Sequence, residues 1–133
     1  MNSEAFVEST GKPYTQTITT GNHTLVADEP TNLGGADKGP APFDYLLSAL
    51  GSCTSITLSM YAERKNIQLD VITVRLTYIP PNEIDGSSSR IIRKIHLEGD
   101  FTDEQEHRML EIADRCPIHK TLRSNVDIMS SFE

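Results

Sequence analysis

The sequence predicts an α+β fold, and three features of its residue pattern carry that prediction. Residues 14–20 and 24–27 alternate between apolar and polar side chains as two short strands do. Residues 43–65 instead place apolar side chains at steps of three and four, the period of a long helix. Two further alternating segments, residues 70–79 and 91–98, predict a second strand pair before short helices. Strands and helices thus occupy separate stretches, as in α+β folds.

Length and charge limit the classes of partner. The chain has 133 residues, the usual size of one domain, so we expect a single domain over residues 1–133. Twelve Lys and Arg against 19 Asp and Glu give a net charge of −7, which makes nucleic acid an unexpected partner. No segment approaches the ~20 apolar residues of a membrane span, and the first residues do not resemble a signal peptide. We therefore expect a cytoplasmic protein with no membrane partner.

The helix expected over residues 43–65 carries an apolar stripe. At the usual rise per residue it would be roughly 34 Å long. A chain of 133 residues can hardly cover so long a helix, so the sequence predicts a homodimer in which a second subunit covers part of it. The predicted stripe consists of Phe43, Leu46, Leu47, Leu50, Cys53, Thr57, Met60 and Tyr61.

Arg93 interrupts the apolar face of the strand expected over residues 91–98. The ordinary interpretation is an edge arginine whose aliphatic stem packs inside while its guanidinium reaches water. The alternative is a functional cation, because a guanidinium in apolar surroundings acts strongly on a nearby thiolate. The sequence favours the first interpretation and leaves the second open.

Helix-start signals mark the C-terminal third of the chain. Thr102 and Gln105 are the ends of a capping box, with acidic residues in the first turn of the helix. Pro117 suits the first position of another short helix, which places Cys116 at its N-cap. A last strand is expected over residues 126–132.

Cys53 and Cys116 are the two cysteines of the chain. In a reducing compartment such a pair is seldom a structural disulfide. The spacing of the two cysteines is compatible with inert core thiols, which are the commoner case, and also with reactive thiols. Cys116 has basic neighbours and an expected helix N-terminus, which both lower the pKa of a thiol. Cys53 lies on the apolar stripe, where a buried thiol is normally inert. For Cys53 to react, the fold would have to bring an acid and a base to it. The histidines are scattered, and we expect neither a metal nor a cofactor.

Two motifs are centred on the cysteines. The first joins the glycine-rich LGGADKGPAP, residues 33–42, to LLSALGSCT, residues 46–54, and the second is IADRCPIH, residues 112–119. In both motifs the chain resembles the OsmC/Ohr family. The resemblance implies an OsmC-like fold, an intertwined homodimer with long central helices packed between β-sheets. It also implies an active site at the subunit interface.

The resemblance also implies roles for individual residues. In the peroxidase branches of the family the first cysteine attacks an organic hydroperoxide and the second resolves the sulfenic acid, roles that fall on Cys53 and Cys116. A family glutamate before the cysteine helix corresponds to Asp44, which is one methylene shorter. The implied function is a thiol-dependent peroxidase in oxidative-stress defence, with catalytic residues Cys53, Cys116 and Asp44 and a dithiol reductant.

The arginine that the family carries near its N-terminus has no counterpart here. The first arginine is Arg64, and acidic residues around Asp28 occupy the corresponding neighbourhood. Arg93 and Lys38 are the candidate cations that would replace it near Cys53. Its absence keeps two alternatives open: a non-catalytic dimer that binds a small ligand in the interfacial apolar pocket, and a structural dimer with inert cysteines.

Overall fold

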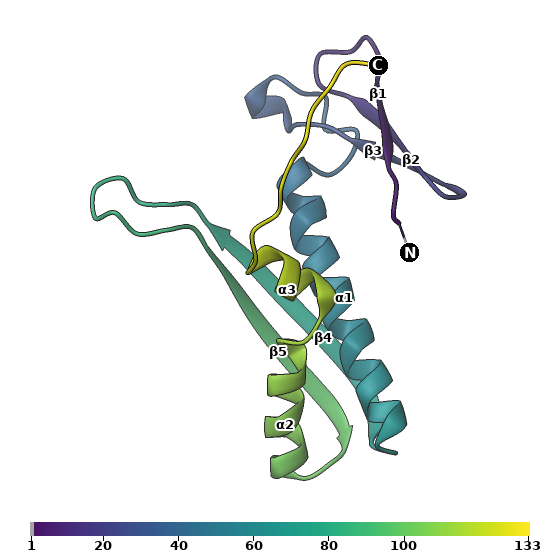
Figure 1. The fold of residues 1–133 in the computed structure, drawn as a ribbon, viewed down its shortest axis with the longest axis vertical. Helices are drawn as coiled ribbons and strands as arrows, with labels where there is room; N and C mark the ends of the chain where they lie inside the picture. Colours follow the sequence, from purple (N-terminus) through teal and green to yellow (C-terminus); the bar gives the residue numbers. More distant parts are fainter. Residues whose placement is uncertain (1) are drawn as a thin grey trace. The chain divides into compact units, whose positions relative to one another are not determined.

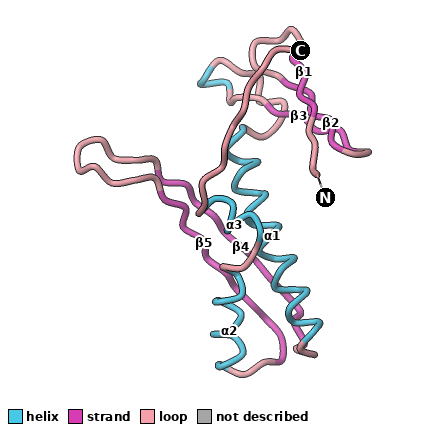
Figure 2. The backbone as a smooth tube through the Cα atoms, in the orientation of Figure 1, coloured by secondary structure: helices cyan, strands magenta, loops and turns pink. Residues whose placement is uncertain are grey.

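The computed structural model describes residues 2–133 as three α-helices, one 3-10 helix (Thr31–Leu33) and two antiparallel sheets (Figures 1 and 2). This mixture of elements confirms the predicted α+β class. The chain forms two compact units, which meet in sequence between residues 46 and 47 and are described in turn. No helix within residues 2–133 is long and apolar enough to cross a membrane.

The first unit contains a three-stranded sheet in the order β1 (Phe6–Ser9), β2 (Gln16–Thr20) and β3 (His23–Ala27). The hairpin of β2 and β3 was predicted and is confirmed, and its turn contains Gly21 at a φ of 57°, where glycine avoids the steric cost of a side chain. Strand β1 was not predicted as a separate range. All four of its residues are exposed, so its sequence carries no inside–outside alternation.

Asp28, directly after β3, organises the glycine-rich segment that follows it. Its side chain is buried, with a relative exposure of 2% for the residue. One carboxylate oxygen accepts hydrogen bonds from the Thr15 hydroxyl at 2.8 Å and the Lys38 N–H at 3.2 Å. The other accepts from the N–H groups of Glu29 at 2.8 Å and Ala36 at 3.5 Å. Burial alone would raise the pKa of Asp28, but these donors outweigh it and hold the pKa below its usual value.

We expect Asp28→Asn to lower the melting temperature at neutral pH by roughly 5 °C, because an amide cannot accept hydrogen bonds at both of its polar atoms. The pKa of Asp28 is lower in the folded chain than in the unfolded chain. Its stabilising contribution is therefore complete above the unfolded value and is lost as the pH falls through the folded value. Thermal melts should show the two proteins converging in acid. The exposed Asp37→Asn is the matched control, and equal melts of Asp28→Asn and wild type at neutral pH would contradict the assignment.

The second unit consists of most of α1 (Pro42–Arg64), the antiparallel pair β4 (Gln68–Ile79) and β5 (Arg90–Asp100), and the helices α2 (Asp103–Ala113) and α3 (Pro117–Leu122). These elements confirm the predicted order. Their ends lie within two residues of those expected for the long helix, β4 and β5. The predicted capping box at the start of α2 is also present, with both of its reciprocal hydrogen bonds.

The core of the second unit lies between α1, α2 and the inward face of the β4–β5 sheet. Its buried members are Leu58, Ala62, Ile67, Met109, Ile112 and Ala113. Helix α1 approaches β4 closely at Gly51, where an added Cβ atom would lie 2.7 Å from Leu76 Cδ1. This close approach places the turn of α1 that contains Cys53 near the sheet.

Within one chain the predicted stripe on α1 is only partly buried. Met60 and Phe43, two of its members, are 58% and 52% exposed. The buried side chains of α1 recur every fourth residue, at Leu50, Thr54, Leu58 and Ala62. The helix is apolar around much of its circumference, so the period of its sequence does not select one face. Cys53 lies at the edge of the buried line and is half-buried.

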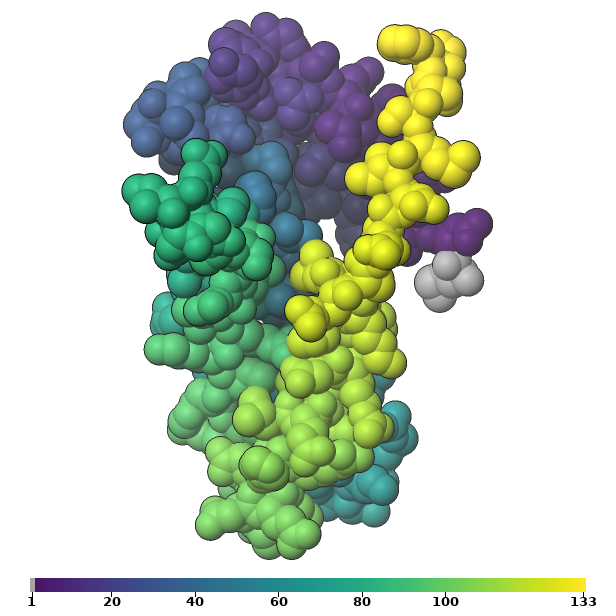
Figure 3. Space-filling model, turned by 60° about the vertical axis from the view of Figure 1, so that its left-hand side comes forward, coloured from purple at the N-terminus to yellow at the C-terminus, as the bar shows by residue number. Residues whose placement is uncertain are grey.

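The last strand, predicted over residues 126–132, is not present. Residues 125–133 have no regular structure (Figure 2), and Ile128, Met129 and Phe132 are largely exposed. In Figure 3 this C-terminal segment, in yellow, stands out from the surface. The alternation in its sequence suits a strand, but a strand requires a hydrogen-bonded neighbour. Among the described residues, no strand pairs with it.

Candidate active site

Cys116 lies at the N-cap of α3, as its position before Pro117 predicted. Its backbone is extended, with φ −61° and ψ 137°, and Pro117 occupies the start of the helix. The Cys116 Sγ accepts a hydrogen bond from the His119 N–H at 3.3 Å. The sulfur thereby satisfies one of the N–H groups that a helix leaves unpaired at its start. The residue is fully buried, so the fold fixes the position of this thiol.

The Cys53 and Cys116 thiols lie close enough to influence each other, although the two residues are far apart in sequence. Both cysteines are free thiols. The Cys53 thiol also accepts a hydrogen bond from the Ile118 N–H and interacts with the Thr57 hydroxyl. Helix α1 and the start of α3 therefore bring together the two residues that carry redox chemistry in the resemblance.

Burial is the largest influence on the acidity of Cys53, and it raises the pKa of the thiol because a thiolate is poorly solvated there. Cys116 raises it further by hydrogen bonding and by the repulsion of a second negative charge. The Ile118 N–H and the Thr57 hydroxyl lower it in part, and the net pKa remains above the usual value. Cys53 therefore holds little thiolate at neutral pH.

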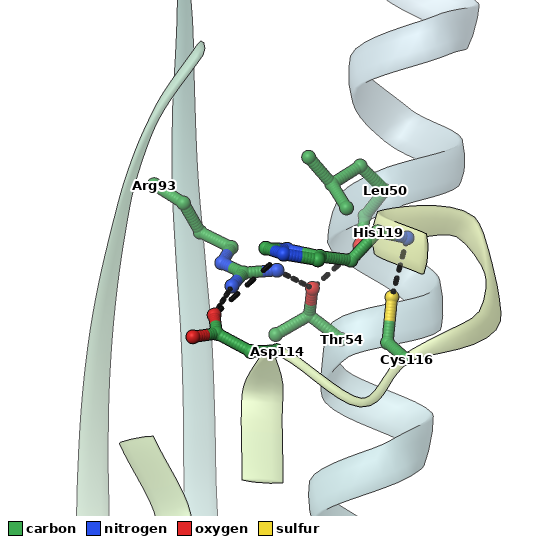
Figure 4. Close-up of polar contacts among 6 residues, drawn as sticks. All are labelled: Leu50, Thr54, Arg93, Asp114, Cys116 and His119. Atoms are coloured by element: carbon green, nitrogen blue, oxygen red, sulfur yellow. Dashed lines mark hydrogen bonds and ion pairs between the residues drawn. The ribbon is translucent and has the colours of Figure 1, made fainter. Parts of the chain in front are cut away.

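Arg93 is not the solvent-directed edge arginine that the sequence favoured. Its side chain is only 12% exposed, and its guanidinium donates to the Thr54 Oγ1 at 3.1 Å and to the Asp114 Oδ1 at 2.7 Å (Figure 4). Thr54 and Asp114 come from other elements and both accept from the guanidinium. The Thr54 acceptor is fully buried, whereas the Asp114 side chain is 65% exposed, so Arg93 bridges the interior and the surface.

The charge of Arg93 is paired with that of Asp114, whose side chain is 65% exposed. Its hydrogen bonds go to Thr54, the neighbour of Cys53, and not to the thiol itself. The side chain of His119 lies at the same carboxylate, with 3.8 Å between its Nδ1 and the Asp114 Oδ1. We call Arg93, Thr54, Asp114 and His119 the Arg93 network.

Sequence reasoning did not identify Thr54 or Asp114. The available signal was a lone inward arginine together with an aspartate two residues before Cys116. Such a pair indicates a possible ion pair only when the fold places the two side chains together. In the part of the chain that the structure describes, no group of three or more His, Cys, Asp or Glu side chains is arranged to hold a metal ion.

Asp44 and Lys38 belong to the first unit. Asp44 lies in the first turn of α1, where its carboxylate accepts a hydrogen bond from the Ala41 N–H at 3.1 Å. This contact favours the start of the helix. Lys38 contributes its backbone N–H to Asp28. The catalytic role of Asp44 and a charge role for Lys38 at Cys53 both stay predictions.

A pocket of about 350 Å³ opens in the second unit away from the cysteines. Its lining comes from α1, β5 and α2, and contains neither Cys53 nor Cys116. The lining residues are Leu58, Ile95, Leu97, Asp103, Glu106, His107, Met109 and Leu110. This cavity does not supply a binding site for a substrate of either thiol.

The family model described as OsmC-like protein matches residues 35–131, a range that contains both cysteines. No curated protein matches the chain. Among solved structures, the OsmC like protein from Mycoplasma pneumoniae has a TM-score of 0.78 and 21% identity, over 92% of this chain and 88% of that one.

Two other similar structures carry a function in their names. An organic hydroperoxide resistance protein OsmC from Legionella pneumophila has a TM-score of 0.69 and 21% identity, over 96% of this chain and 93% of that one. The organic hydroperoxide resistance protein OhrB of Bacillus subtilis has a TM-score of 0.62 and 21% identity, over 96% and 94%. These similarities confirm the OsmC-like fold of the chain.

Proposed function

The chain belongs to the OsmC-like protein family, and on that premise we propose that it is a thiol-dependent peroxidase that reduces organic hydroperoxides. The observation that carries the proposal is the contact between the free thiols of Cys53 and Cys116. Two proteins of similar fold are named organic hydroperoxide resistance proteins, which supports this substrate class. The proposal places the protein in the cytoplasm, in defence against oxidative stress.

In the first step the Cys53 thiolate attacks one oxygen of the hydroperoxide. An S–O bond forms, the O–O bond breaks, and the second oxygen leaves as an alcohol after taking up a proton. The sulfur loses two electrons and becomes a sulfenic acid, while the peroxide is reduced. The Ile118 N–H and the Thr57 hydroxyl favour the thiolate needed for this step.

In the second step the Cys116 sulfur attacks the Cys53 sulfenic acid. An S–S bond forms, the S–O bond breaks, and water leaves with the proton of the Cys116 thiol. An external dithiol then reduces the disulfide by exchange and is itself oxidised to a disulfide. Asp44 remains the proposed carboxylate of the site on the family resemblance alone.

Consumption of an organic hydroperoxide in the presence of a dithiol tests the function directly. We expect wild-type protein to consume cumene hydroperoxide with dithiothreitol, and more slowly with a monothiol, because a dithiol completes the exchange within one molecule. Protein omitted from the reaction gives the background rate. If wild-type protein does not raise consumption above this background, the peroxidase proposal is wrong.

A second candidate function is the binding of a small ligand without catalysis. The raised pKa of Cys53 favours it, because a thiol that holds little thiolate reacts slowly. The same assay separates the two functions. A binding protein leaves the hydroperoxide intact whichever reductant is present.

We also propose that the protein is a homodimer. Helix α1 presents Ile56 and Met60 to solvent at 54% and 58% exposure, and a second copy would bury such side chains. Light scattering at micromolar concentration should therefore give about twice the chain mass of 14.8 kDa. Ile56→Glu should shift the mass toward that of one chain, with Glu63→Gln, a change at an exposed polar position of α1, as the control. A folded wild-type monomer in this measurement would contradict the proposal.

A further inference from the structure

One side chain, that of Arg93, connects the two segments that carry the cysteines. Thr54 follows Cys53 on α1 and accepts from the Arg93 Nη1 at 3.1 Å. Asp114 is the C-cap residue of α2, two positions before Cys116, and accepts from the Arg93 Nη2 at 2.7 Å. Figure 4 shows the guanidinium between these two acceptors.

The contact at Thr54 has a defined direction. The Thr54 hydroxyl donates to the Leu50 carbonyl at 2.7 Å, which leaves its lone pairs to accept from Arg93. Thr54 is fully buried, and the side chain of Arg93 is 12% exposed. A planar guanidinium with fixed donors bonds two acceptors at once with little loss of freedom. The contact therefore constrains the distance between α1 and the end of α2.

The segment from Asp114 to His119 is held to β5 at its first residue and is bonded internally at its other end. Asp114 binds Arg93, and the N–H of His119 donates to the Cys116 sulfur. His119 also places its Nδ1 3.8 Å from the Asp114 Oδ1. Cys116 lies between Asp114 and His119 and is fully buried. A movement of Asp114 would therefore displace the Cys116 sulfur relative to Cys53.

We propose that Arg93 is a positioning residue for disulfide formation, which holds Asp114 against Thr54 and thereby sets the separation of the Cys53 and Cys116 sulfur atoms. The inference rests on the proposed function only for the identity of the natural oxidant. Disulfide formation itself can be driven by oxidised glutathione. In that reaction the two thiols lose two electrons and two protons, and oxidised glutathione becomes two molecules of glutathione.

The test is the equilibrium of the Cys53–Cys116 disulfide in mixtures of reduced and oxidised glutathione. Arg93→Met keeps most of the side-chain volume and removes both donors. We expect it to lower the equilibrium constant for disulfide formation about tenfold, because misplaced groups lose effective concentration. For two electrons this makes the reduction potential about 30 mV less negative. Arg75→Met, on the exposed face of β4, is the matched control and should leave the equilibrium unchanged.

Two further variants keep the inference testable if Arg93→Met does not fold. Arg93→Lys keeps the charge but lacks the planar fork, so its shift should have the same direction and a smaller size. Asp114→Asn weakens the other end of the contact, and Glu111→Gln, which alters the nearby pair with Arg108, is its control. Circular dichroism establishes that each variant is folded. Wild-type equilibrium constants in folded Arg93→Met, or in both Arg93→Lys and Asp114→Asn, would overturn the inference.

The outcome is independent of peroxidase activity. If wild-type protein fails to consume hydroperoxide while the Arg93 variants shift the glutathione equilibrium, the proposed function fails and the positioning role stands. If hydroperoxide is consumed and the equilibrium of the folded variants does not move, the reverse holds.

Discussion

Cys53→Ser is expected to lower the consumption of organic hydroperoxide by a factor on the order of a thousand or more. A serine hydroxyl is hardly ionised at neutral pH and cannot be oxidised to the equivalent of a sulfenic acid. The measurement is the initial rate with a dithiol present. Ser52→Ala is the matched control, because Ser52 is the exposed neighbour of Cys53. Its hydroxyl donates to the backbone carbonyl of Ser48 in α1 at 2.8 Å. Substantial activity in Cys53→Ser would remove this residue from the attacking role.

Cys116→Ser separates the second step from the first. The variant should still consume one equivalent of hydroperoxide, and mass spectrometry should then find Cys53 one oxygen atom heavier. Its turnover with a dithiol should fall, since the sulfenic acid has no neighbouring thiol to form a disulfide. We also expect an internal disulfide in oxidised wild-type protein, and none in Cys53→Ser or Cys116→Ser. Wild-type turnover in Cys116→Ser would contradict the resolving role.

The reactivity of Cys53 should increase about tenfold per pH unit across the neutral range, or about a thousandfold over three units. The reason is that burial, followed by Cys116, raises the pKa of the thiol. The protonated form then dominates at neutral pH, and each unit of pH multiplies the small thiolate fraction. Site-specific alkylation of Cys53 by iodoacetamide, followed by mass spectrometry, measures this fraction. The rate should continue to rise through the usual pKa of a cysteine and level off only above it.

A small thiol such as N-acetylcysteine in the same buffers provides the reference curve for alkylation. The curve for Cys53 should lie on its alkaline side. An alkylation rate that is already constant between about pH 6 and 8 would mean that the thiolate forms readily, contrary to the raised pKa. Such a result would indicate that a group other than Arg93, Thr54, Asp114 or His119 lowers the pKa of Cys53.

Local signals predicted much of the fold, because they depend on residues near one another in the chain. Thr102 and Gln105 marked the start of α2, and Pro117 marked the start of α3 and the N-cap position of Cys116. The inward alternation of β5 was also correct, including the inward direction of Arg93. The helix starts are selected by hydrogen bonds within a few residues, and the alternation of β5 by the period of the strand itself.

The site depended on contacts that local patterns do not contain. Arg93 was predicted to reach solvent, but its guanidinium instead bonds Thr54 and Asp114, which are distant in sequence. The contact of Cys53 with Cys116 likewise followed from the family resemblance and not from their spacing. Residues 126–132 show the opposite failure, since a local strand pattern had no neighbouring strand in the described chain.

The burial of Cys53 also has a consequence for the choice of reagent. The surroundings that disfavour a thiolate also disfavour any charged group that approaches the sulfur, because such a group must give up its hydration. A neutral electrophile with an apolar body meets a smaller barrier of this kind. We therefore expect the half-buried Cys53 to react with uncharged oxidants in preference to ionic ones.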